Sequence, residues 1–382
     1  MEWKNTADVV VIGGGILGVS TAYYLAKNGM KNVTLIEKGT ICGGSTGRCG
    51  AGIRAQWGTE MNCRLGVAAL DTFEQLSDEL GMDVGLNQGG YLLVAYSDKE
   101  METLGAGMKL QNSLGIQSRN ISLAEARQIC PGLAADDAVG FFFHARDGHA
   151  DPFLTTFAYL EKAKTLGVTP YRFTECTGIS VKDGTVTGVE TNRGHIDAPI
   201  VINCAGAYAQ DIAKMVGVNI HTWGERHEIM ITEPVAPGVC PCMLMSFSGN
   251  YYIQQRPHGS IICGMSPEGH PADYQLKDTW QFVEAMSKIL VHLLPRTKGI
   301  RVVRQWSGLY DMTPDAQPII GETDIKNFYH STGYSGHGFM LAPVAGKILA
   351  QHIMGKKPDI DFSMLDYRRF DRGEHIRESN VV

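Results

Sequence analysis

The feature that most constrains this chain is a glycine-rich turn near its start. A short strand pattern, Asp8–Ile12, leads into three glycines spaced as G-x-G-x-x-G, namely Gly13, Gly15 and Gly18. Apolar residues at helical spacing follow over Ile16–Lys27. In such a unit the first glycine permits a tight turn, the second lets the backbone approach a pyrophosphate, and the third allows close packing of helix on strand. The helix N-terminus adds N–H groups and a positive dipole, so the pattern predicts a dinucleotide site.

A second strand pattern, Val33–Glu37, supports that prediction. It ends in Glu37, about 20 residues beyond the glycines, where such folds place an acid that accepts hydrogen bonds from ribose hydroxyls. A carboxylate there also disfavours the additional phosphate of NADP. The two strands, the turn and the acid therefore indicate FAD or NAD.

The overall composition excludes several other classes of protein. The chain has 382 residues and a formal net charge of −6, and it contains no basic run, which argues against nucleic acid as a partner. The first apolar run is too short for a signal sequence or a membrane span. Nine cysteines without a CxxC pair favour a reducing cytoplasm. Cys240-Pro-Cys242 has no matching second pair, so no metal site is expected.

The rest of the chain alternates helix and strand patterns. We expect helices over Glu60–Leu80, Asp278–Leu294 and Gly338–Met354, and one from Pro152 that Gly167 ends; we expect strands over Asn87–Ala95, Val139–His144, Pro199–Cys204 and Asn327–Thr332. Residues 168–204 show strands and turns that suggest a small antiparallel meander. Because nucleotide-binding elements occur at both ends and in the middle, the domains are expected to interleave.

Five segments resemble a known family. They are Val9–Gly29, STGRCGAGIRAQW over Ser45–Trp57, INCAGAYA over Ile202–Ala209, GLYDMTPDAQPIIG over Gly308–Gly321 and GYSGHGFMLAP over Gly333–Pro343. Their order and spacing resemble the FAD-dependent amine oxidoreductases, the superfamily of D-amino-acid oxidase, glycine oxidase and sarcosine oxidase. The similarity covers nearly the whole chain, and it is strongest to sarcosine oxidase β-subunits and dye-linked L-proline dehydrogenase β-subunits. It favours FAD over NAD.

The resemblance implies an α/β plus α+β fold with two interleaved parts. A Rossmann-like FAD-binding domain would comprise residues 1–85, 146–220 and 305–382. A smaller substrate domain with an antiparallel sheet would comprise residues 86–145 and 221–304. FAD would lie extended, with its adenine end at the glycine turn and its flavin ring at the domain boundary.

The turn and the resemblance together predict the residues that contact FAD. They are Gly13, Gly15, Ile16, Leu17, Gly18, Glu37, Lys38, Ser45, Thr46, Arg48, Cys49, Gly50, Cys176, Ala205, Gly206, Gly308, Gly336, His337, Gly338, Phe339 and Met340. The small residues among them suit a backbone that passes close to a flat ring or a pyrophosphate. In the related proteins the helix after Gly336 faces the flavin with its N-terminus, whose dipole stabilises negative charge.

Four residues are candidates for substrate binding or catalysis. Arg54 stands where relatives with carboxylate substrates present an arginine, and a guanidinium holds a carboxylate by two parallel hydrogen bonds. His337 is expected as a scaffold beside the flavin, with action on the substrate amine as the alternative. His227 and Tyr252 are expected in the wall of the substrate cleft. Tyr310 replaces an arginine that some glycine oxidases use for the carboxylate, which argues against a glycine oxidase.

Two positions bear on how FAD is held and reoxidised. Gly308 stands where monomeric sarcosine oxidases carry the cysteine that links flavin, so the FAD is expected to be non-covalent, with Cys49 as a minor alternative. Ile262 stands near the lysine that assists oxygen reduction in those oxidases. An apolar side chain there predicts slow reaction with oxygen.

The resulting functional hypothesis is oxidation of the C–N bond of a small amino or imino acid by hydride transfer to flavin N5. The chain would be the catalytic β-subunit of a dye-linked dehydrogenase complex acting on L-proline or a sarcosine-like substrate. A second flavoprotein or iron–sulfur subunit, an electron acceptor and an FMN at a subunit interface are further expectations from relatives. The alternatives are a self-sufficient oxidase that makes hydrogen peroxide, a flavin-free structural subunit, and an NAD-dependent dehydrogenase.

Overall fold

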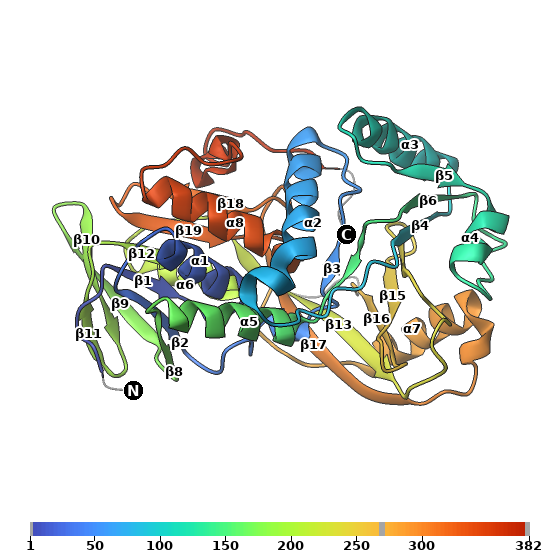
Figure 1. Ribbon diagram of the computed structural model, residues 1–382, viewed down its shortest axis with the longest axis horizontal. Helices are drawn as coiled ribbons and strands as arrows, with labels where there is room; N and C mark the ends of the chain where they lie inside the picture. Colours follow the sequence, from blue (N-terminus) through green and yellow to red (C-terminus); the bar gives the residue numbers. More distant parts are fainter. Residues whose placement is uncertain (1–2, 267–271, 379–382) are drawn as a thin grey trace.

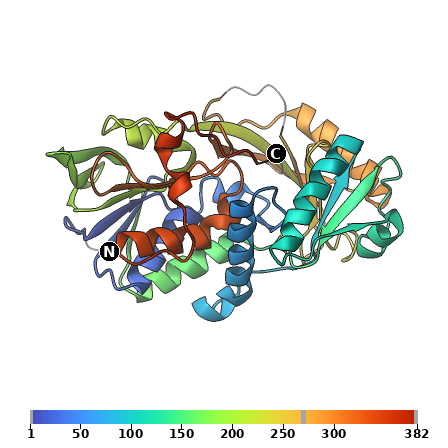
Figure 2. The ribbon, with the colours of Figure 1, turned by 90° about the horizontal axis from the view of Figure 1, so that it is seen from above.

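Two sheets organise the molecule and lie towards its opposite ends (Figure 1). The structure is a computed structural model that describes residues 3–266 and 272–378. One sheet has six strands and the other has eight, and two smaller sheets of three and two strands complete the β-structure of the described residues. The chain passes between the two large sheets several times, so the interleaved arrangement expected from the sequence is confirmed (Figure 2).

The six-stranded sheet contains the predicted βαβ unit. Its strands, in spatial order, are β18 (Ile319–Glu322), β19 (Phe328–Thr332), β12 (Val201–Asn203), β1 (Val9–Ile12), β2 (Val33–Glu37) and β8 (Thr169–Arg172). All neighbouring strands are parallel except β18 and β19. β1 is apolar and buried along its whole length, as a strand of a parallel sheet covered on both faces should be.

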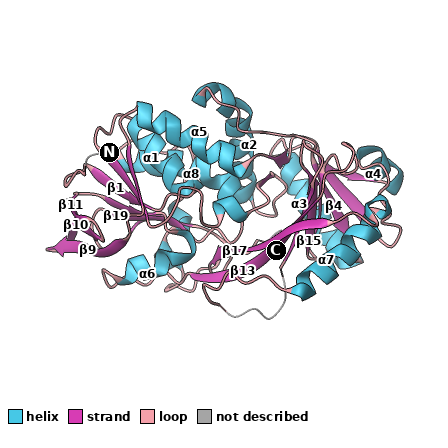
Figure 3. Ribbon diagram, turned by 90° about the horizontal axis from the view of Figure 1, so that it is seen from below, coloured by secondary structure: helices cyan, strands magenta, loops and turns pink. Residues whose placement is uncertain are grey.

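Helices cover one face of this sheet and a small sheet covers the other. The helices are α1 (Ile16–Lys27), α5 (Pro152–Thr165) and α8 (Gly338–Ile353), which lie side by side in Figure 3. The small sheet is the antiparallel meander of β9 (Cys176–Lys182), β10 (Thr185–Thr191) and β11 (Gly194–Asp197). The meander was predicted, but β8 is not part of it, because its backbone pairs in parallel with β2.

The eight-stranded sheet forms the other end of the molecule. Its strands, in spatial order, are β17 (Val302–Met312), β13 (Trp223–Thr232), β16 (Ile261–Met265), β15 (Tyr251–Gln255), β14 (Met243–Ser246), β4 (Tyr91–Ala95), β6 (Gly140–His144) and β5 (Arg119–Ile121). All neighbours are antiparallel except β14 and β4. α7 (Trp280–Leu293) and α4 (Leu123–Ile129) share a core with one face of the sheet, and α3 (Asp98–Ser113) packs through Leu104 with another cluster of its residues.

Four further elements complete the part of the fold that surrounds the two large sheets. α2 (Glu60–Leu80) packs on α8, where the Phe73 and Phe339 rings lie 5.6 Å apart. β3 (Gly52–Ile53) pairs with β7 (Gly148–His149), and α6 (Ala209–Lys214) follows β12. The bounds of α2 agree with the prediction residue for residue, since Thr59 caps its start and the left-handed Gly81 ends it.

The fold class predicted from the sequence is confirmed, whereas the domain boundaries remain predictions. All strands of the eight-stranded sheet except β17 come from the two predicted substrate segments, 86–145 and 221–304. β17 begins at Val302 and pairs with β13 along its length, so the strand crosses the predicted boundary at residue 305. α3 was not predicted, because few of its side chains are buried and its apolar periodicity is correspondingly weak.

Candidate functional site

A cavity of about 560 Å³ is lined by residues from both large sheets. The predicted site residues that line it are Gly13, Gly15, Ile16, Leu17, Glu37, Lys38, Ser45, Thr46, Arg48, Cys49, Gly50, Arg54, Cys176, Ala205, Gly206, His227, Tyr252, Gly308, Gly336, His337, Gly338, Phe339 and Met340. The structure therefore brings together residues from all five of the segments that carry the family resemblance. Gly18 lies beside the cavity and has a packing role.

The glycine turn shows why each glycine is needed. Gly13 has φ +114°, a backbone conformation that favours glycine. A Cβ on Gly18 would collide with the Gly13 carbonyl oxygen, so this third glycine allows α1 to approach β1. Gly15 caps α1 without a side chain, and the Ile16 N–H donates to Thr46 Oγ1 at 3.1 Å. The N-terminus of α1 is thus held against the cavity wall, as a pyrophosphate site requires.

Glu37 stands at the end of β2 with both carboxylate oxygens engaged by backbone. The Gly14 N–H donates to Oε2 and the Gly39 N–H donates to Oε1, each at 2.7 Å. These bonds fix the carboxylate on the cavity wall, and carboxylate oxygens keep lone pairs for further donors. The arrangement suits acceptance from ribose hydroxyls.

An aromatic wall stands next to Glu37. The Lys38 ammonium lies 3.1 Å from the centre of the Tyr208 ring, and Tyr208 stacks on Tyr274 at 4.7 Å. Burial lowers the pKa of Lys38. Cys176 lines the same cavity from the start of β9, where the resemblance places the adenine side. Sequence reasoning missed Tyr208, although it stands within the quoted segment Ile202–Ala209.

The short helical turn Thr46–Arg48 contacts β17. Arg48 donates through Nη1 to the Ser307 carbonyl oxygen at 3.1 Å, and a Cβ on Gly308 would lie 3.0 Å from Arg48 Cβ. Cys49 donates from Sγ to the Thr46 carbonyl oxygen, and burial raises the pKa of its thiol to about 12. A thiol that stays protonated is a poor nucleophile, which supports non-covalent FAD.

Arg54 lies in the cavity wall with its guanidinium buried, at 1% exposure. Nη1 donates to the Gln56 carbonyl oxygen at 2.5 Å, Nη2 lies 3.4 Å from His337 Nε2, and the guanidinium carbon lies 3.8 Å from the centre of the Trp57 ring. Burial, with the charge of Arg54, lowers the pKa of His337 to about 3. The ring is therefore neutral at pH 7 and accepts from Arg54, which favours the scaffold role for His337.

His227 and Tyr252 also stand in the cavity wall, as predicted, and the structure adds Tyr310. The His227 ring stacks on the Tyr310 ring at 3.6 Å, and His227 Nδ1 lies 2.6 Å from Ser266 Oγ. A Cβ on Gly50 would lie 2.7 Å from the Tyr252 ring. Burial raises the pKa of both tyrosines, so they remain phenols. This wall is flat and aromatic, and its two tyrosines are uncharged.

Other wall residues had no signal in the sequence. Tyr91 from β4 and Met243 and Met245 from β14 line the cavity, although none belongs to a recognised motif. The tip of Tyr91 would meet a Cβ on Gly52 in a close clash, which explains the glycine there. Only the pairing of β4 with β14, which come from distant parts of the chain, brings these side chains together.

Two predictions about single residues have structural outcomes. Ile262 lies on β16, but Gly264 and Met265 of that strand line the cavity in its place. The Cys240 and Cys242 thiols are buried, and Cys240 Sγ donates to the Cys242 carbonyl oxygen at 3.3 Å. Over the described parts of the chain, no set of three or more His, Cys, Asp or Glu side chains is arranged to hold a metal ion.

The fold and the cavity define a dinucleotide-binding protein of the Rossmann-like type with a second, mostly antiparallel sheet over the cofactor site. The chain belongs to the DAO family of FAD dependent oxidoreductases, whose sequence model matches residues 8–352. The β-subunit of sarcosine oxidase from Arthrobacter sp. is 30% identical, over 100% of this chain and 95% of that protein. The crystal structure of L-proline dehydrogenase from P. horikoshii aligns with a TM-score of 0.94 and 36% identity, over 98% of this chain and 100% of that one.

A more distant structure agrees in fold alone. Glycine oxidase from Geobacillus kaustophilus aligns with a TM-score of 0.89 at 22% identity, over 96% of this chain and 99% of that one. Within residues 3–266 and 272–378, no helix combines the length and the apolar character that a membrane crossing needs.

The residues present fit FAD. The glycine turn and the N-terminus of α1 suit a pyrophosphate, and the Glu37 carboxylate suits a ribose. A Cβ on Gly50 or on Gly264 would collide with the Tyr252 ring, so these glycines let the flat face of this ring stand in the cavity wall. A flat ring needs such a surface.

Proposed function

We propose that this protein oxidises the C–N bond of a small amino or imino acid, with L-proline or a sarcosine-like secondary amine as substrate. The observation that carries the proposal is the buried Arg54 guanidinium in the cavity wall. A buried guanidinium binds a carboxylate through two parallel hydrogen bonds, which fixes the α-carbon as well as the acid group. Relatives named for L-proline and sarcosine support this class of substrate.

FAD bound in the cavity would supply the acceptor for the hydride that leaves the substrate carbon. The chain's own residues orient the substrate and exclude water from the site. Arg54, with Trp57 packed against it, orients the carboxylate, and Tyr252 and Tyr310 give aromatic surfaces that exclude water. His337 stays neutral and holds Arg54, so it does not serve as the base. A substrate amine that binds in its neutral form needs no strong base, and the imine product is later hydrolysed by water.

We extend the proposal to the electron acceptor and the assembly. The chain would be the catalytic β-subunit of a dye-linked dehydrogenase in the cytoplasm, together with a second flavoprotein or an iron–sulfur subunit, and FMN would bind at a subunit interface. The name of the sarcosine oxidase relative as a β-subunit supports a heteromeric complex. The name of the aligned L-proline dehydrogenase supports a dehydrogenase.

The test is anaerobic bleaching of the FAD-saturated protein by a panel of L-proline, sarcosine, hydroxyproline and glycine. We expect the absorbance of the oxidised flavin to disappear after anaerobic mixing with L-proline or sarcosine. A yellow protein that none of the panel bleaches would contradict the proposed reaction. A protein that binds no flavin would instead support a structural subunit, and reduction of NAD would support an NAD enzyme.

A further inference from the structure

The last described residue, Glu378, binds the residues at the start of α2, including the Thr59 cap. Its Oε1 accepts from the Gly58 N–H at 2.7 Å. Its Oε2 accepts from the Thr59 N–H at 3.1 Å, from Thr59 Oγ1 at 2.9 Å and from Asn62 Nδ2 at 2.9 Å. A carboxylate at a helix N-terminus satisfies N–H groups that lack partners within the helix and also interacts favourably with the helix dipole. Glu378 therefore connects the loop before α2 (residues 54–59) to the C-terminal segment (residues 369–378).

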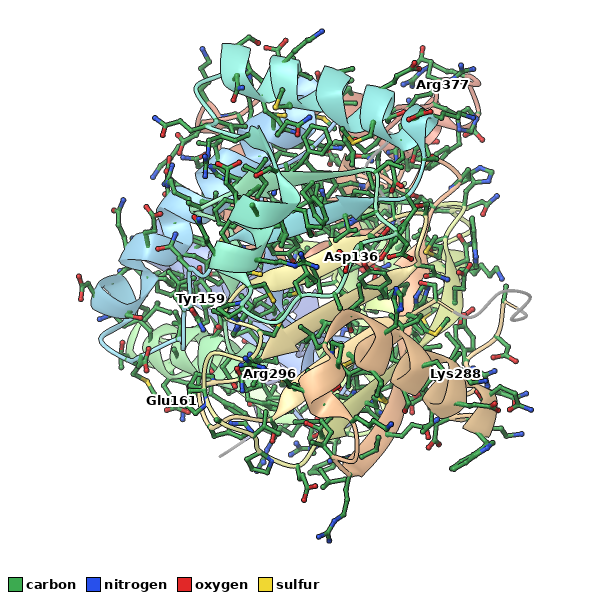
Figure 4. All side chains as sticks on the ribbon, turned by 90° about the vertical axis from the view of Figure 1, so that its right-hand side faces the viewer. Asp136, Tyr159, Glu161, Lys288, Arg296 and Arg377 are labelled. Atoms are coloured by element: carbon green, nitrogen blue, oxygen red, sulfur yellow. The ribbon has the colours of Figure 1, made fainter. Side chains whose placement is uncertain are left out.

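The C-terminal segment is itself anchored near the site. Arg369 and Asp315, both about 1% exposed at the side chain, form a paired salt bridge with two 2.9 Å hydrogen bonds. The Ile376 N–H donates to the same Asp315 carboxylate at 3.2 Å. Arg377 then lies exposed at the surface (Figure 4). Asp315 thus holds the residues that directly precede Glu378 in place.

The loop that Glu378 holds carries Arg54. Trp57 Nε1 donates to the Arg54 carbonyl oxygen at 3.1 Å, and the Trp57 ring packs against both the guanidinium, at 3.8 Å, and the His337 ring, whose centre is 4.6 Å away. A second carboxylate holds the other end of the loop: Asp147 accepts from the Ala55 N–H at 2.8 Å. Carboxylates thus fix this loop at both ends, one from the neighbourhood of β7 and one from the C-terminal segment.

We propose that Glu378 is a positioning residue for the substrate carboxylate, because it holds Gly58 and Thr59 and thereby fixes Trp57 under the Arg54 guanidinium. The substrate part of this inference rests on the proposed function. Bidentate binding needs the guanidinium plane in one orientation, and the Trp57 ring sets that plane. Loss of the Glu378 contacts would free the loop, weaken substrate binding and leave the rate at saturation nearly unchanged.

The experiment compares Glu378→Gln with Glu374→Gln in the full chain saturated with FAD. The amide in Glu378→Gln would keep one acceptor oxygen, but its NH2 group would face the donors that bind the other carboxylate oxygen. Among the described residues, the Glu374 carboxylate pairs with the exposed Arg372 on the same segment. Hydrogen exchange measured on peptides covering residues 55–65 reads the loop directly. Stopped-flow bleaching by L-proline and by sarcosine then gives the half-saturating concentration and the limiting rate.

We expect Glu378→Gln to speed exchange in residues 55–65 and to raise the half-saturating concentration about fivefold or more, with a limiting rate within about twofold. Glu374→Gln should change neither. Unchanged exchange in Glu378→Gln would overturn the contact itself, and faster exchange with unchanged half-saturation would overturn its role in substrate binding. If neither amino acid bleaches the wild-type flavin, the proposed function and the substrate part of the inference both fail, while the exchange result still decides whether Glu378 holds the loop.

Discussion

The two ends of the cavity are built in opposite ways. At the nucleotide end the walls are backbone and short side chains, with the turn at Gly13–Gly18 and the Glu37 carboxylate held by two N–H groups. At the substrate end they are large buried side chains, with Arg54 stacked on Trp57 and Tyr310 stacked on His227. The first end would recognise groups common to many nucleotides, whereas binding at the second would depend on the orientation of individual side chains.

This difference predicts how the two ends respond to substitution. A wall of backbone has no side chain to move aside, so an added methyl group must exclude the ligand or distort the turn. Where the wall consists of side chains, truncating one of them weakens ligand binding according to the contacts removed, and the protein stays folded. The predictions below test that contrast in order of the expected effect.

The largest effect is expected at Gly15. A Cβ there would lie 3.0 Å from Thr46 Oγ1, the oxygen that holds the N-terminus of α1. Gly15→Val should weaken FAD binding roughly 100-fold or more, or about 3 kcal/mol, as measured by fluorescence titration of the apoprotein. Gly105→Ala is the control, since a Cβ on this α3 glycine meets no atom within 4 Å. Equal flavin affinity in both variants would show that the turn is not the pyrophosphate site.

The next effect is expected at Arg54. Arg54→Ala removes two hydrogen bonds to a charged carboxylate, so the half-saturating substrate concentration should rise by the equivalent of roughly 2–4 kcal/mol. Arg54→Lys keeps the charge but loses the paired geometry, so a smaller rise of several-fold is expected. Both variants should keep the flavin spectrum. Normal binding of a carboxylate inhibitor by Arg54→Ala would make Arg54 structural and would turn attention to Arg48, which also lines the cavity.

A smaller effect is expected in the choice of electron acceptor. Among the described residues, Lys38 is the only lysine along the cavity wall, and it stands at the nucleotide end beside Tyr208. The substrate end has no lysine among the described residues, and the substrate carboxylate would engage the Arg54 guanidinium there, so developing superoxide gains little electrostatic stabilisation. The substrate-reduced enzyme should therefore reoxidise about tenfold or more slowly in air-saturated buffer than with an artificial dye. Comparable rates with stoichiometric peroxide would favour an oxidase.

The same contrast explains what the sequence could predict. The βαβ unit, Glu37 and the bounds of α2 were predictable because turns, caps and periodicity are local. The stack of His227 on Tyr310 and the placement of Tyr91 beside Gly52 depend on strand pairing between distant segments, for which one sequence carries no local signal. Glu378 is the extreme case, since its partners Gly58 and Thr59 lie some 320 residues earlier.

The smallest effect concerns Asp311, which connects the two ends. Its carboxylate accepts from the Gly333 N–H at 2.7 Å, next to the turn that carries His337, and its neighbour Thr332 donates to the Gly206 carbonyl oxygen at the nucleotide end. Burial raises the pKa of Asp311 to about 6. The unfolded chain has the ordinary value near 4, so between roughly pH 4 and pH 6 the folded state alone keeps this proton. Folded stability therefore falls as pH rises through this window and levels off above it.

Asp311→Asn removes that titration and keeps an acceptor for Gly333. With saturating FAD, the melting temperature of the wild type relative to Asp311→Asn should fall by up to a few degrees between roughly pH 4.5 and pH 7. Asp359→Asn provides a control of opposite sign. Hydrogen bonds from Lys347 and Gln351 lower the pKa of Asp359, so the wild type should gain stability over that variant as pH rises from acid values. A difference between wild type and Asp311→Asn that does not change with pH would mean that Asp311 titrates normally and that the joint between the two ends is open to water.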